Sequence, residues 1–472
     1  MSLPAPDRSW WRSLAAGESI ELPDPLPIPA GRRLRGRVQP PPSKSVSHRY
    51  LTLALLAGRE VRVERLLRAD DLDLFLAALE RCGRPVRREG SAVVVGAAAS
   101  PGFGGSPTAR RDQAVRLDCG NAGTMFRFLT AALTAIPGRW VLDGTPRLRQ
   151  RPIAPLVDAL RQLGAELRYL EVEGHAPLAI DGATLDGGEC SLDASQSSQF
   201  LSALLMAGSR ARRPLEIEVT ALRSDPYVDV TAAGLTTFGL AAVSSGSTAP
   251  GSDRWSVRPA REDEVAGGPG TVLVEADYSA VAYPAAGAAL TGGDVVIEGL
   301  DPGSAQGDRR FLELLLEMGA GVEWGESWVR VRGSRLRGVD VDLSALPDQV
   351  PTLAAVACFA RGETVIRNVA HLRHKESDRL SSVTLELRET GFEVEEGPDF
   401  LRIAGGAGEL PREPVVVETH DDHRIAMSLA LVGLMRPGLA IAAPGVVAKS
   451  YPGFWRDLAV LVSSNSLDDS ER

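Results

Sequence analysis

The segment GNAGTMFRFLTAALTA, residues 120–135, opens with polar and small residues and continues into a run typical of a buried helix. Five other segments have the same form: PSKSVSHRYLTLALLAG, SQSSQFLSALLMAG, DYSAVAYPAAGAALTG, PDQVPTLAAVACFARG and DDHRIAMSLALVGL. One marker residue from each polar cluster recurs every 71 to 80 residues: Lys44, Asn121, Ser197, Asp277, Asp348 and Asp422. Such regular spacing predicts six copies of one structural unit.

A second helix is expected later in five of the units, because a helix-like run ends on a glycine before a β-rich stretch. Each of these glycines suits a left-handed helix C-cap: Gly83, Gly164, Gly239, Gly319 and Gly391. Runs such as LEIEVT and DVVIEGL predict strands between the helices. We therefore expect a mixed α/β fold of six units in two domains, with a boundary near the Gly- and Pro-rich residues 262–277.

Composition limits the class of protein. The chain has 472 residues, 44% hydrophobic and 5% aromatic, which is typical of soluble globular proteins with more than one domain. Its nearly apolar runs are too short to cross a bilayer, and its first thirty residues lack a signal-peptide core. We expect a cytoplasmic protein with a loose N-terminal arm. The four cysteines are far apart, which indicates neither a disulfide framework nor a zinc site.

Basic side chains are the most informative charges. A net charge of −9 disfavours a nucleic-acid-binding protein. However, the stretch RHKESDRL, residues 373–380, has six ionisable side chains in eight positions. The cations that we single out, most of them at turns or expected helix starts, are Lys44, Arg49, Arg151, Lys375, Arg379, Arg424 and Lys449. Taken singly, each is more often a surface charge, but helix starts also expose N–H groups that attract anions. Together they predict a local anion-binding site.

Eight motifs, in order, identify a family. They are SKSVSHR at 43–49, GNAGTMFR at 120–127, RPI at 151–153, SSQFLSALLM at 197–206, PD at 347–348, KESDRL at 375–380, DHR at 422–424 and AKSYP at 448–452. Over roughly residues 35–465 the chain resembles the 5-enolpyruvylshikimate-3-phosphate synthase family. The resemblance implies the enolpyruvyl transferase fold, a two-domain inside-out α/β barrel. Each domain has three βαβαββ units with helices inside and sheets outside, and two crossover segments join the domains.

The expected domain limits follow from this likeness and from the repeat. Residues 1–32 are expected to form a partly disordered arm, and residues 466–472 a disordered tail. The N-terminal domain is expected to span residues 43–268, and the C-terminal domain to combine residues 33–42 with 269–465.

The resemblance also implies an activity, that of 3-phosphoshikimate 1-carboxyvinyltransferase in the shikimate pathway to chorismate and aromatic amino acids. Such enzymes move the enolpyruvyl group of phosphoenolpyruvate onto the 5-hydroxyl of shikimate 3-phosphate and release phosphate. The implied partners are these two small molecules, and the implied protein is a cytoplasmic monomer without cofactor or metal, and a glyphosate target. The implied ligands of shikimate 3-phosphate are Lys44, Ser45, Arg49, Ser197, Ser198, Gln199, Ser224, Asp348, His371 and Lys375. Those of phosphoenolpyruvate are Lys44, Gly123, Arg151, Gln199, Arg379, Arg424 and Lys449.

Catalytic roles are implied for three residues. Asp348 is expected to take the proton of the attacking hydroxyl, Glu376 to exchange a proton at the vinyl carbon, and Lys44 to assist. Without the surrounding motifs, an ordinary helix N-cap would be the favoured interpretation of Asp348. Two positions depart from the family pattern: His371 stands where asparagine is usual, and Phe128 stands where proline is usual. They leave open a contact to shikimate 3-phosphate and the response to inhibitors.

Three other functions compete with this interpretation. HLRH at 371–374 and HDDH at 420–423 contain four of the six histidines, which a metal-dependent hydrolase would use. UDP-N-acetylglucosamine enolpyruvyl transferase shares the fold but typically uses a loop cysteine as an acid, and the loop after GTPRLRQRPI has none. A non-catalytic binding paralogue is the third alternative. Because the implied ligands fall in both halves, a complete site is expected to need both domains.

Overall fold

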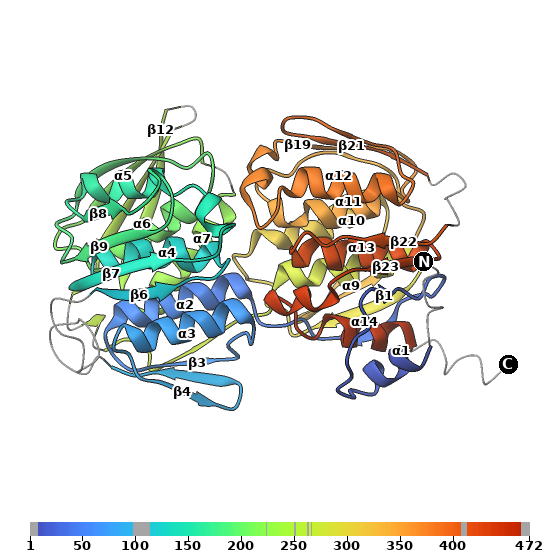
Figure 1. The fold of residues 1–472 in the computed structure, drawn as a ribbon, viewed down its shortest axis with the longest axis horizontal. Helices are drawn as coiled ribbons and strands as arrows, with labels where there is room; N and C mark the ends of the chain where they lie inside the picture. The colour runs from blue at the N-terminus through green and yellow to red at the C-terminus, as the bar shows by residue number, and fades with distance from the viewer. Residues whose placement is uncertain are drawn as a thin grey trace. The chain divides into compact units, whose positions relative to one another are not determined.

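The computed structural model describes residues 8–97, 114–222, 224–249, 252–261, 264–265, 267–406 and 413–463. The chain forms two compact units, shown in Figure 1. The N-terminal unit is Pro42–Glu275, and the C-terminal unit combines Met1–Pro41 with Ala276–Arg472. The chain therefore passes from one unit to the other twice. The predicted disordered tail, residues 466–472, lies outside the described residues.

The described part of the N-terminal unit contains three four-stranded sheets, which pack together with the helices named below. The strand order in the first sheet is β14 (Thr271–Leu273), β3 (Val61–Glu64), β5 (Ala92–Val95) and β4 (Val86–Glu89). The order in the second sheet is β6 (Val115–Asp118), β7 (Gly138–Asp143), β9 (Leu178–Gly182) and β8 (Glu166–Tyr169). The order in the third sheet is β10 (Gly188–Asp193), β11 (Leu215–Thr220), β13 (Ser252–Pro259) and β12 (Ala241–Ala249). In each sheet the first pair is parallel and the other two pairs are antiparallel.

The helices of the N-terminal unit are of two kinds. Three are buried along nearly their whole length: α2 (Lys44–Ala57), α4 (Gly123–Thr134) and α6 (Gln199–Gly208). Three bury only one face: α3 (Asp70–Arg81), α5 (Ala154–Gln162) and α7 (Pro226–Thr237). A 3-10 turn, η1 (Leu148–Gln150), precedes α5. Helices rich in Ala, Leu and Gly can fill the interior of the unit because they have no polar face to keep in water.

The C-terminal unit repeats this plan. The strand order in its first sheet is β2 (Arg35–Val38), β15 (Asp294–Glu298), β17 (Trp328–Arg332) and β16 (Gly321–Trp324). The order in its second sheet is β18 (Asp340–Asp342), β19 (Gly362–Arg367), β21 (Leu401–Gly405) and β20 (Val394–Glu396). The order in its third sheet is β22 (Val415–Val417), β23 (Leu439–Ile441) and β1 (Leu26–Pro27). The buried helices are α9 (Tyr278–Thr291), α11 (Val350–Ala357) and α13 (His423–Met435). The half-buried ones are α10 (Arg310–Met318), α12 (Arg379–Glu389) and α14 (Phe454–Ser463). The 3-10 turns among its described residues are η2 (Gly307–Arg309), η3 (Pro347–Gln349), η4 (Ala370–His374) and η5 (Pro444–Lys449).

Six copies of one strand and helix pattern are therefore present, as the repeat predicts, and the two units exchange strands. β2 comes just before α2 in the chain, yet it pairs with β15 of the C-terminal unit. β14 comes just before α9, yet it pairs with β3 of the N-terminal unit. This second pairing corrects the predicted domain limits, which assigned residues 269–275 to the C-terminal domain. The other limits stay a prediction.

The N-terminal arm also differs from expectation, because its described part is packed rather than loose. Helix α1 (Arg8–Ala15) buries Trp11, which is 4% exposed, and α1 packs against α14. Strand β1 takes the third place in the last sheet by pairing antiparallel with β23. The arm therefore completes the sixth repeat. Its contact partners lie more than 400 residues away in the chain, which explains why local sequence reading missed them.

The predicted helix C-caps are confirmed. The five glycines all have positive φ, from 65° to 109°: Gly83, Gly164, Gly239, Gly319 and Gly391. This is the left-handed region, where a residue without Cβ is least strained. Each glycine therefore ends a helix and turns the chain toward the next strand.

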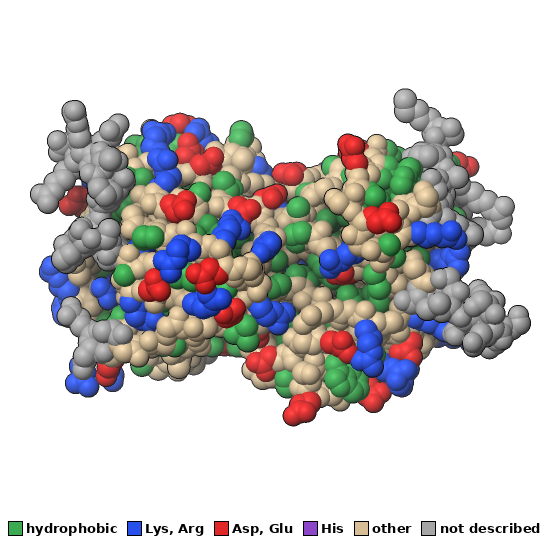
Figure 2. Space-filling view, turned by 90° about the horizontal axis from the view of Figure 1, so that it is seen from below, with side chains coloured by type: hydrophobic (Ala, Val, Ile, Leu, Met, Phe, Trp, Pro, Cys, Tyr) green, Lys and Arg blue, Asp and Glu red, His purple; other side chains and the backbone are tan. Residues whose placement is uncertain are grey.

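Acidic and basic side chains are interspersed on the face shown in Figure 2. Many exposed charges pair locally, as Arg310 does with Glu313 and Glu317 at 2.6 Å each. Such pairs contribute little to stability because water screens them. Among the described helices, none has both the length and the apolar character needed to span a membrane.

Candidate active site

The starts of three helices in the C-terminal unit carry a cluster of charged side chains. Asp348 lies in η3, which leads directly into α11. Arg379 is the first residue of α12, and Glu376 lies three residues before it. Asp422 and Arg424 flank the first residue of α13. The corresponding turns of successive repeats thus bring together residues that are up to 76 positions apart.

Arg379 is the centre of this cluster and is only 1% exposed. Its Nη1 donates to Asp348 Oδ1 at 2.8 Å, its Nη2 to Glu376 Oε2 at 2.9 Å, and its Nε to Asp422 Oδ2 at 2.7 Å. Burial lowers the pKa of Arg379, but the charges of the three carboxylates outweigh burial and raise the pKa above its usual value. The guanidinium is therefore a fixed positive charge that holds three acids in position.

Asp422 connects this cluster to the helix backbone. It is fully buried, it accepts a hydrogen bond from Ser377 Oγ at 3.2 Å, and its Oδ1 caps α13 by accepting from Arg424 N at 2.9 Å. An N-cap carboxylate also interacts favourably with the positive end of the helix dipole. One side chain therefore orients Arg379 and the first turn of α13 together.

Arg424 completes the cluster on the other side of Asp348. Its Nη2 donates to Asp348 Oδ2 at 2.7 Å, and its Nη1 donates to the hydroxyl of Tyr283 at 3.3 Å. Burial raises the pKa of Tyr283 to about 12, so the hydroxyl remains neutral. Asp348 thus bridges two guanidinium groups from different helices.

The electrostatics of Asp348 follow from these neighbours. Burial alone would raise the pKa of its carboxyl, but the positive charges of Arg424, Lys375 and Arg379 outweigh burial and hold the pKa well below its usual range. Asp348 is therefore ionised at neutral pH.

The other predicted ligands of this unit lie at 3-10 turns. Lys375 directly follows η4, where His371 is 7% exposed. Lys449, the last residue of η5, is 9% exposed.

In the N-terminal unit, the start of α2 holds a buried ion pair. Lys44 Nζ lies 2.6 Å from Asp71 Oδ2, and both side chains are largely shielded from water. The Nδ1 atom of His48 lies 2.9 Å from the carbonyl oxygen of Lys44. Burial, together with the nearby charge of Lys44, lowers the pKa of His48 to about 4. The imidazole is therefore neutral, and Lys44 is the cation at this helix start.

Arg49 ties three helices of the same unit together. It is 1% exposed, and it donates to Thr231 Oγ1 at 2.7 Å, to Ser45 Oγ at 2.6 Å and to the carbonyl oxygen of Tyr227 at 2.7 Å. Its guanidinium also lies over the ring of Phe128, 5.3 Å from the centroid. The structure thus brings Arg49 and Ser45 together, with most of the Arg49 donors directed to protein groups.

A second network joins the starts of α4 and α6. Arg127 Nη1 donates to Gln199 Oε1 at 2.8 Å and to Ser197 Oγ at 3.2 Å. Gln199 in turn donates to Thr124 Oγ1 at 3.0 Å. Ser198, directly before α6, is 4% exposed. Ser197 and Gln199, both expected to touch substrate, are therefore oriented by a buried arginine.

Arg151 packs against the backbone at Gly123. Its Nη1 donates to the carbonyl oxygen of Asn121 at 3.4 Å. A Cβ added at Gly123 would lie 2.4 Å from Arg151 Cζ, so no larger residue fits there without moving the guanidinium. Ser224 is 6% exposed and has a φ of 58°, just before α7. The glycine in GNAG thus allows close approach of a cation to a helix start.

The geometry also identifies residues to which the sequence analysis gave no role in the site. Arg127, Asp71, Asp422 and Tyr283 each contact one or more of the predicted residues. Arg127 and Asp422 stand inside the motifs GNAGTMFR and DDHR. Their position within motifs already recognised is the signal that could have identified them.

Comparison with known proteins identifies the family. A family model described as EPSP synthase (3-phosphoshikimate 1-carboxyvinyltransferase) matches residues 28–458. The chain belongs to the EPSP synthase family. It is 42% identical over 431 residues to the 3-phosphoshikimate 1-carboxyvinyltransferase of Vibrio vulnificus (strain YJ016), covering 91% of this chain and 97% of the relative. It is 40% identical over 446 residues to that of Shewanella amazonensis (strain ATCC BAA-1098 / SB2B), covering 93% and 99%.

Solved structures agree with membership of the EPSP synthase family. The chain is similar to the EPSP synthase of Acinetobacter baumannii, with a TM-score of 0.71, 27% identity, and coverage of 92% of this chain and 98% of that one. It shares its fold with the enolpyruvyl transferase NikO of Streptomyces tendae, with a TM-score of 0.71, 20% identity and coverage of 93% and 98%. The predicted fold, six repeats in two units, is therefore confirmed.

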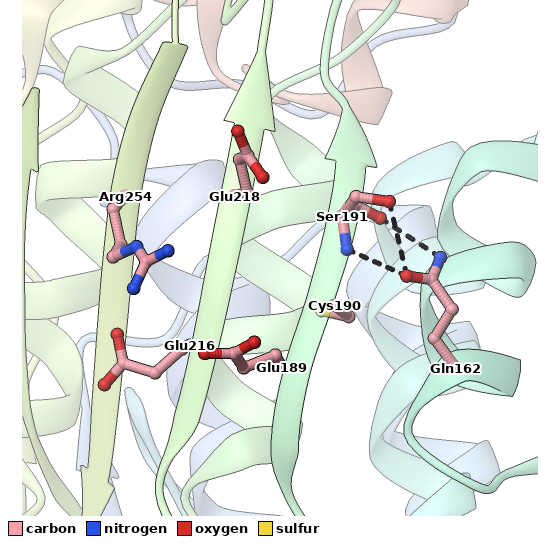
Figure 3. Close-up of a pocket in the computed structure, with 7 residues that line it drawn as sticks. All are labelled: Gln162, Glu189, Cys190, Ser191, Glu216, Glu218 and Arg254. Atoms are coloured by element: carbon pink, nitrogen blue, oxygen red, sulfur yellow. Dashed lines mark hydrogen bonds between the residues drawn. The ribbon is translucent and has the colours of Figure 1, made fainter. Parts of the chain in front are cut away.

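Two observations concern sites outside the EPSP synthase pattern. Within the described part of the chain, no group of three or more His, Cys, Asp or Glu side chains could hold a metal ion. A pocket of about 220 Å³ lies on the polar face of the β10–β13 sheet (Figure 3), lined by Gln162, Glu189, Cys190, Ser191, Glu216, Glu218 and Arg254. Gln162 of α5 is held there by the backbone of Ser191. The pocket contains none of the predicted substrate ligands.

Proposed function

We propose that this chain transfers the enolpyruvyl group of phosphoenolpyruvate to the 5-hydroxyl of shikimate 3-phosphate, giving 5-enolpyruvylshikimate 3-phosphate and phosphate. Family membership supports the proposal. The observation that carries the proposal is the ionised Asp348, which lies between the guanidiniums of Arg379 and Arg424. Glu376 accepts a hydrogen bond from Arg379 as well. This cluster would supply an acid, a base and two anion-binding groups to the reaction, which supports the proposal.

Phosphoenolpyruvate needs several cations because it carries a phosphate and a carboxylate. We assign its binding to Lys44, Gly123, Arg151, Gln199, Arg379, Arg424 and Lys449. Arginine suits this task because its planar donors match both anions. Arg424 is the more accessible of the two cluster arginines, with its side chain 10% exposed against 1% for Arg379. Arg424 is therefore the better placed to donate directly, while Arg379 also holds the carboxylates.

Shikimate 3-phosphate needs hydroxyl and amide partners as well as cations. We assign its binding to Lys44, Ser45, Arg49, Ser197, Ser198, Gln199, Ser224, Asp348, His371 and Lys375. The contact of Arg127 with both Ser197 and Gln199 supports a preorganised phosphate site at the start of α6. His371, in place of the asparagine usual in the family, still offers a ring N–H donor.

The chemistry can be written with these groups. Asp348 accepts the proton of the 5-hydroxyl as its oxygen bonds to C2 of phosphoenolpyruvate, and Glu376 delivers a proton to C3. The phosphate then leaves C2 as Glu376 takes a proton back from C3, which restores the double bond, and the proton held by Asp348 passes to the released phosphate, which regenerates the carboxylate. Lys44 stabilises the charge on the departing phosphate. Anions bound at Arg424 and Arg379 would offset the charges that depress the pKa of Asp348, which would make it a stronger base.

Steady-state phosphate release tests the proposal. Release from phosphoenolpyruvate is expected only when shikimate 3-phosphate is present, with UDP-N-acetylglucosamine as the comparison acceptor. Faster release with the sugar nucleotide would favour the alternative transferase, and no release with either acceptor would favour a binding paralogue.

We also propose that the protein works as a cytoplasmic monomer without cofactor. The expectation from the family supports this part. Light scattering coupled to gel filtration, with and without both substrates, measures the mass against the 50.1 kDa of one chain. A mass near twice that value would contradict it.

A further inference from the structure

The N-terminal arm contacts Ala443, the residue that precedes the turn carrying Lys449. The arm up to residue 27 precedes the residues that match the family model, which begin at 28. It packs within the C-terminal unit through α1, β1 and the residues between them. Its partners on that side are β23, α14 and Ala443, the residue before η5, and η5 ends at Lys449.

Asp24 makes the most direct of these contacts. Its Oδ1 accepts a hydrogen bond from Ala443 N at 2.9 Å. Ala443 immediately precedes η5 and has a φ of 45° and a ψ of 53°, in the left-handed region. That conformation is unfavourable for alanine, so it persists only where surrounding contacts hold it. Asp24 therefore fixes the backbone from which η5 begins.

Trp11 provides a second contact through an aromatic pair. Its ring meets Trp455 edge to face, with centroids 6.5 Å apart. Trp455 Nε1 donates to the carbonyl oxygen of Pro444, the first residue of η5, at 2.9 Å. Trp11 Nε1 donates to the carbonyl oxygen of Pro27 in β1 at 3.2 Å, which anchors the helix to the arm's own strand. The beginning of η5 is thus held from two directions.

We propose that Asp24 and Trp11 are positioning residues that set the location of Lys449 for phosphoenolpyruvate binding. The inference rests on the proposed role of Lys449. A 3-10 turn of six residues has little stability of its own, so the direction of Lys449 depends on the contacts that hold Ala443 and Pro444. The arm therefore influences the affinity for phosphoenolpyruvate, in addition to providing strand β1 of the last sheet.

Substitutions at Asp24 test the hydrogen bond in the full chain. Asp24→Ala removes the acceptor, whereas Asp24→Asn keeps an amide oxygen at the same place. We expect Asp24→Ala to raise KM for phosphoenolpyruvate roughly fivefold, the factor for one lost hydrogen bond of ordinary strength. KM for shikimate 3-phosphate and kcat should change less than twofold, and Asp24→Asn should restore the KM. Glu21→Ala, an exposed acid in the same arm, is the matched control.

A double-substitution cycle separates this inference from the proposed function. Lys449→Met alone should raise KM for phosphoenolpyruvate, and adding Asp24→Ala should then raise it no further. If Lys449→Met has no effect, the role of Lys449 is wrong. If Lys449→Met has its effect but Asp24→Ala adds the same factor in both backgrounds, or none in either, Asp24 does not act through Lys449.

Hydrogen exchange gives a readout independent of turnover. Peptides covering residues 443–451 should exchange faster in Asp24→Ala and in Trp11→Ala than in the parent or in Glu21→Ala. Trp455→Phe, which keeps a ring but removes the N–H to Pro444, should have the same effect as Trp11→Ala. Unchanged exchange in this segment, or equal increases throughout the C-terminal unit, would overturn the proposal in favour of a purely structural arm.

Discussion

Replacing Asp422 by alanine would remove a buried carboxylate that both caps a helix and pairs with an arginine. The carboxylate of Asp422 accepts hydrogen bonds from Arg379 Nε at 2.7 Å, Ser377 Oγ at 3.2 Å and Arg424 N at 2.9 Å, and the residue is 0% exposed. Breaking a buried ion pair from one side costs about 3 to 5 kcal/mol, because the remaining charge loses a partner without regaining water. For a unit of this size, that lowers its melting temperature by about 6 to 20 °C.

The kinetic effect should accompany the loss of stability. Without Asp422, Arg379 keeps Asp348 and Glu376 as partners but loses the group that holds its Nε. A displaced Arg379 guanidinium should cost more than about 1.4 kcal/mol of transition-state stabilisation, and that free energy corresponds to a factor of ten in rate. We therefore expect kcat/KM for phosphoenolpyruvate to fall at least tenfold. Asp422→Asn keeps the cap and an acceptor, so its loss of stability should be about half as large.

Calorimetry and steady-state phosphate release measure both quantities. Glu418→Ala is the control, because its side chain is exposed in the loop that leads to α13 and should change stability by less than about 0.5 kcal/mol. A melting temperature for Asp422→Ala within about 2 °C of the parent, together with unchanged kcat/KM, would refute the account of this cluster.

Three further predictions concern the substrate site. Arg151→Ala, Arg379→Ala and Arg424→Ala should each cost about 2 to 4 kcal/mol in kcat/KM for phosphoenolpyruvate, measured by phosphate release, and unchanged values in all three would exclude the assigned ligands. Asp348→Asn and Glu376→Gln should keep substrate binding in calorimetric titration but lose most turnover; near-parental kcat in both would contradict the acid and base roles. Because the pKa of Asp348 is depressed in the folded protein, its ionised carboxylate stabilises the fold at every pH above the ordinary aspartate pKa near 4, and this stabilisation is lost only at lower pH. Asp348 should therefore contribute no change in stability between pH 8 and pH 5. If the melting temperature of Asp348→Asn changed with pH differently from that of the parent in this range, the expectation would be wrong.

Much of the fold could be predicted because it is repeated. The 71 to 80 residue spacing of the marker residues and the five helix-ending glycines depend on local sequence, and the structure confirms both the repeat and the caps. The family resemblance led us to expect residues 33–42, which contain β2, in the C-terminal domain. The pairing of β14 with β3 was not predicted, because β14 precedes a helix of the C-terminal unit and pairs within the N-terminal one. The packing of Trp11 was missed for a related reason, since its partner Trp455 is far away in the chain.

The candidate site shows the same division. Motifs identified Asp348, Glu376 and Arg379, and the structure brings these three together, although their roles stay a prediction. Motifs did not indicate that Arg379 is nearly inaccessible or that Arg127 orients Gln199. Those facts depend on side-chain directions set by packing between repeats, and a linear pattern carries no information about them.

The placement of β1 and β2 has a consequence for the order of folding during synthesis. β2 ends at residue 38, but its partner β15 begins at residue 294, and β1 must wait for β23 at residue 439. At about 5 to 20 residues per second, β2 remains unpaired for roughly 13 to 50 seconds after it is made. The N-terminal unit, complete at Glu275, can fold during that interval. The C-terminal unit therefore closes last, around strands that the ribosome made first.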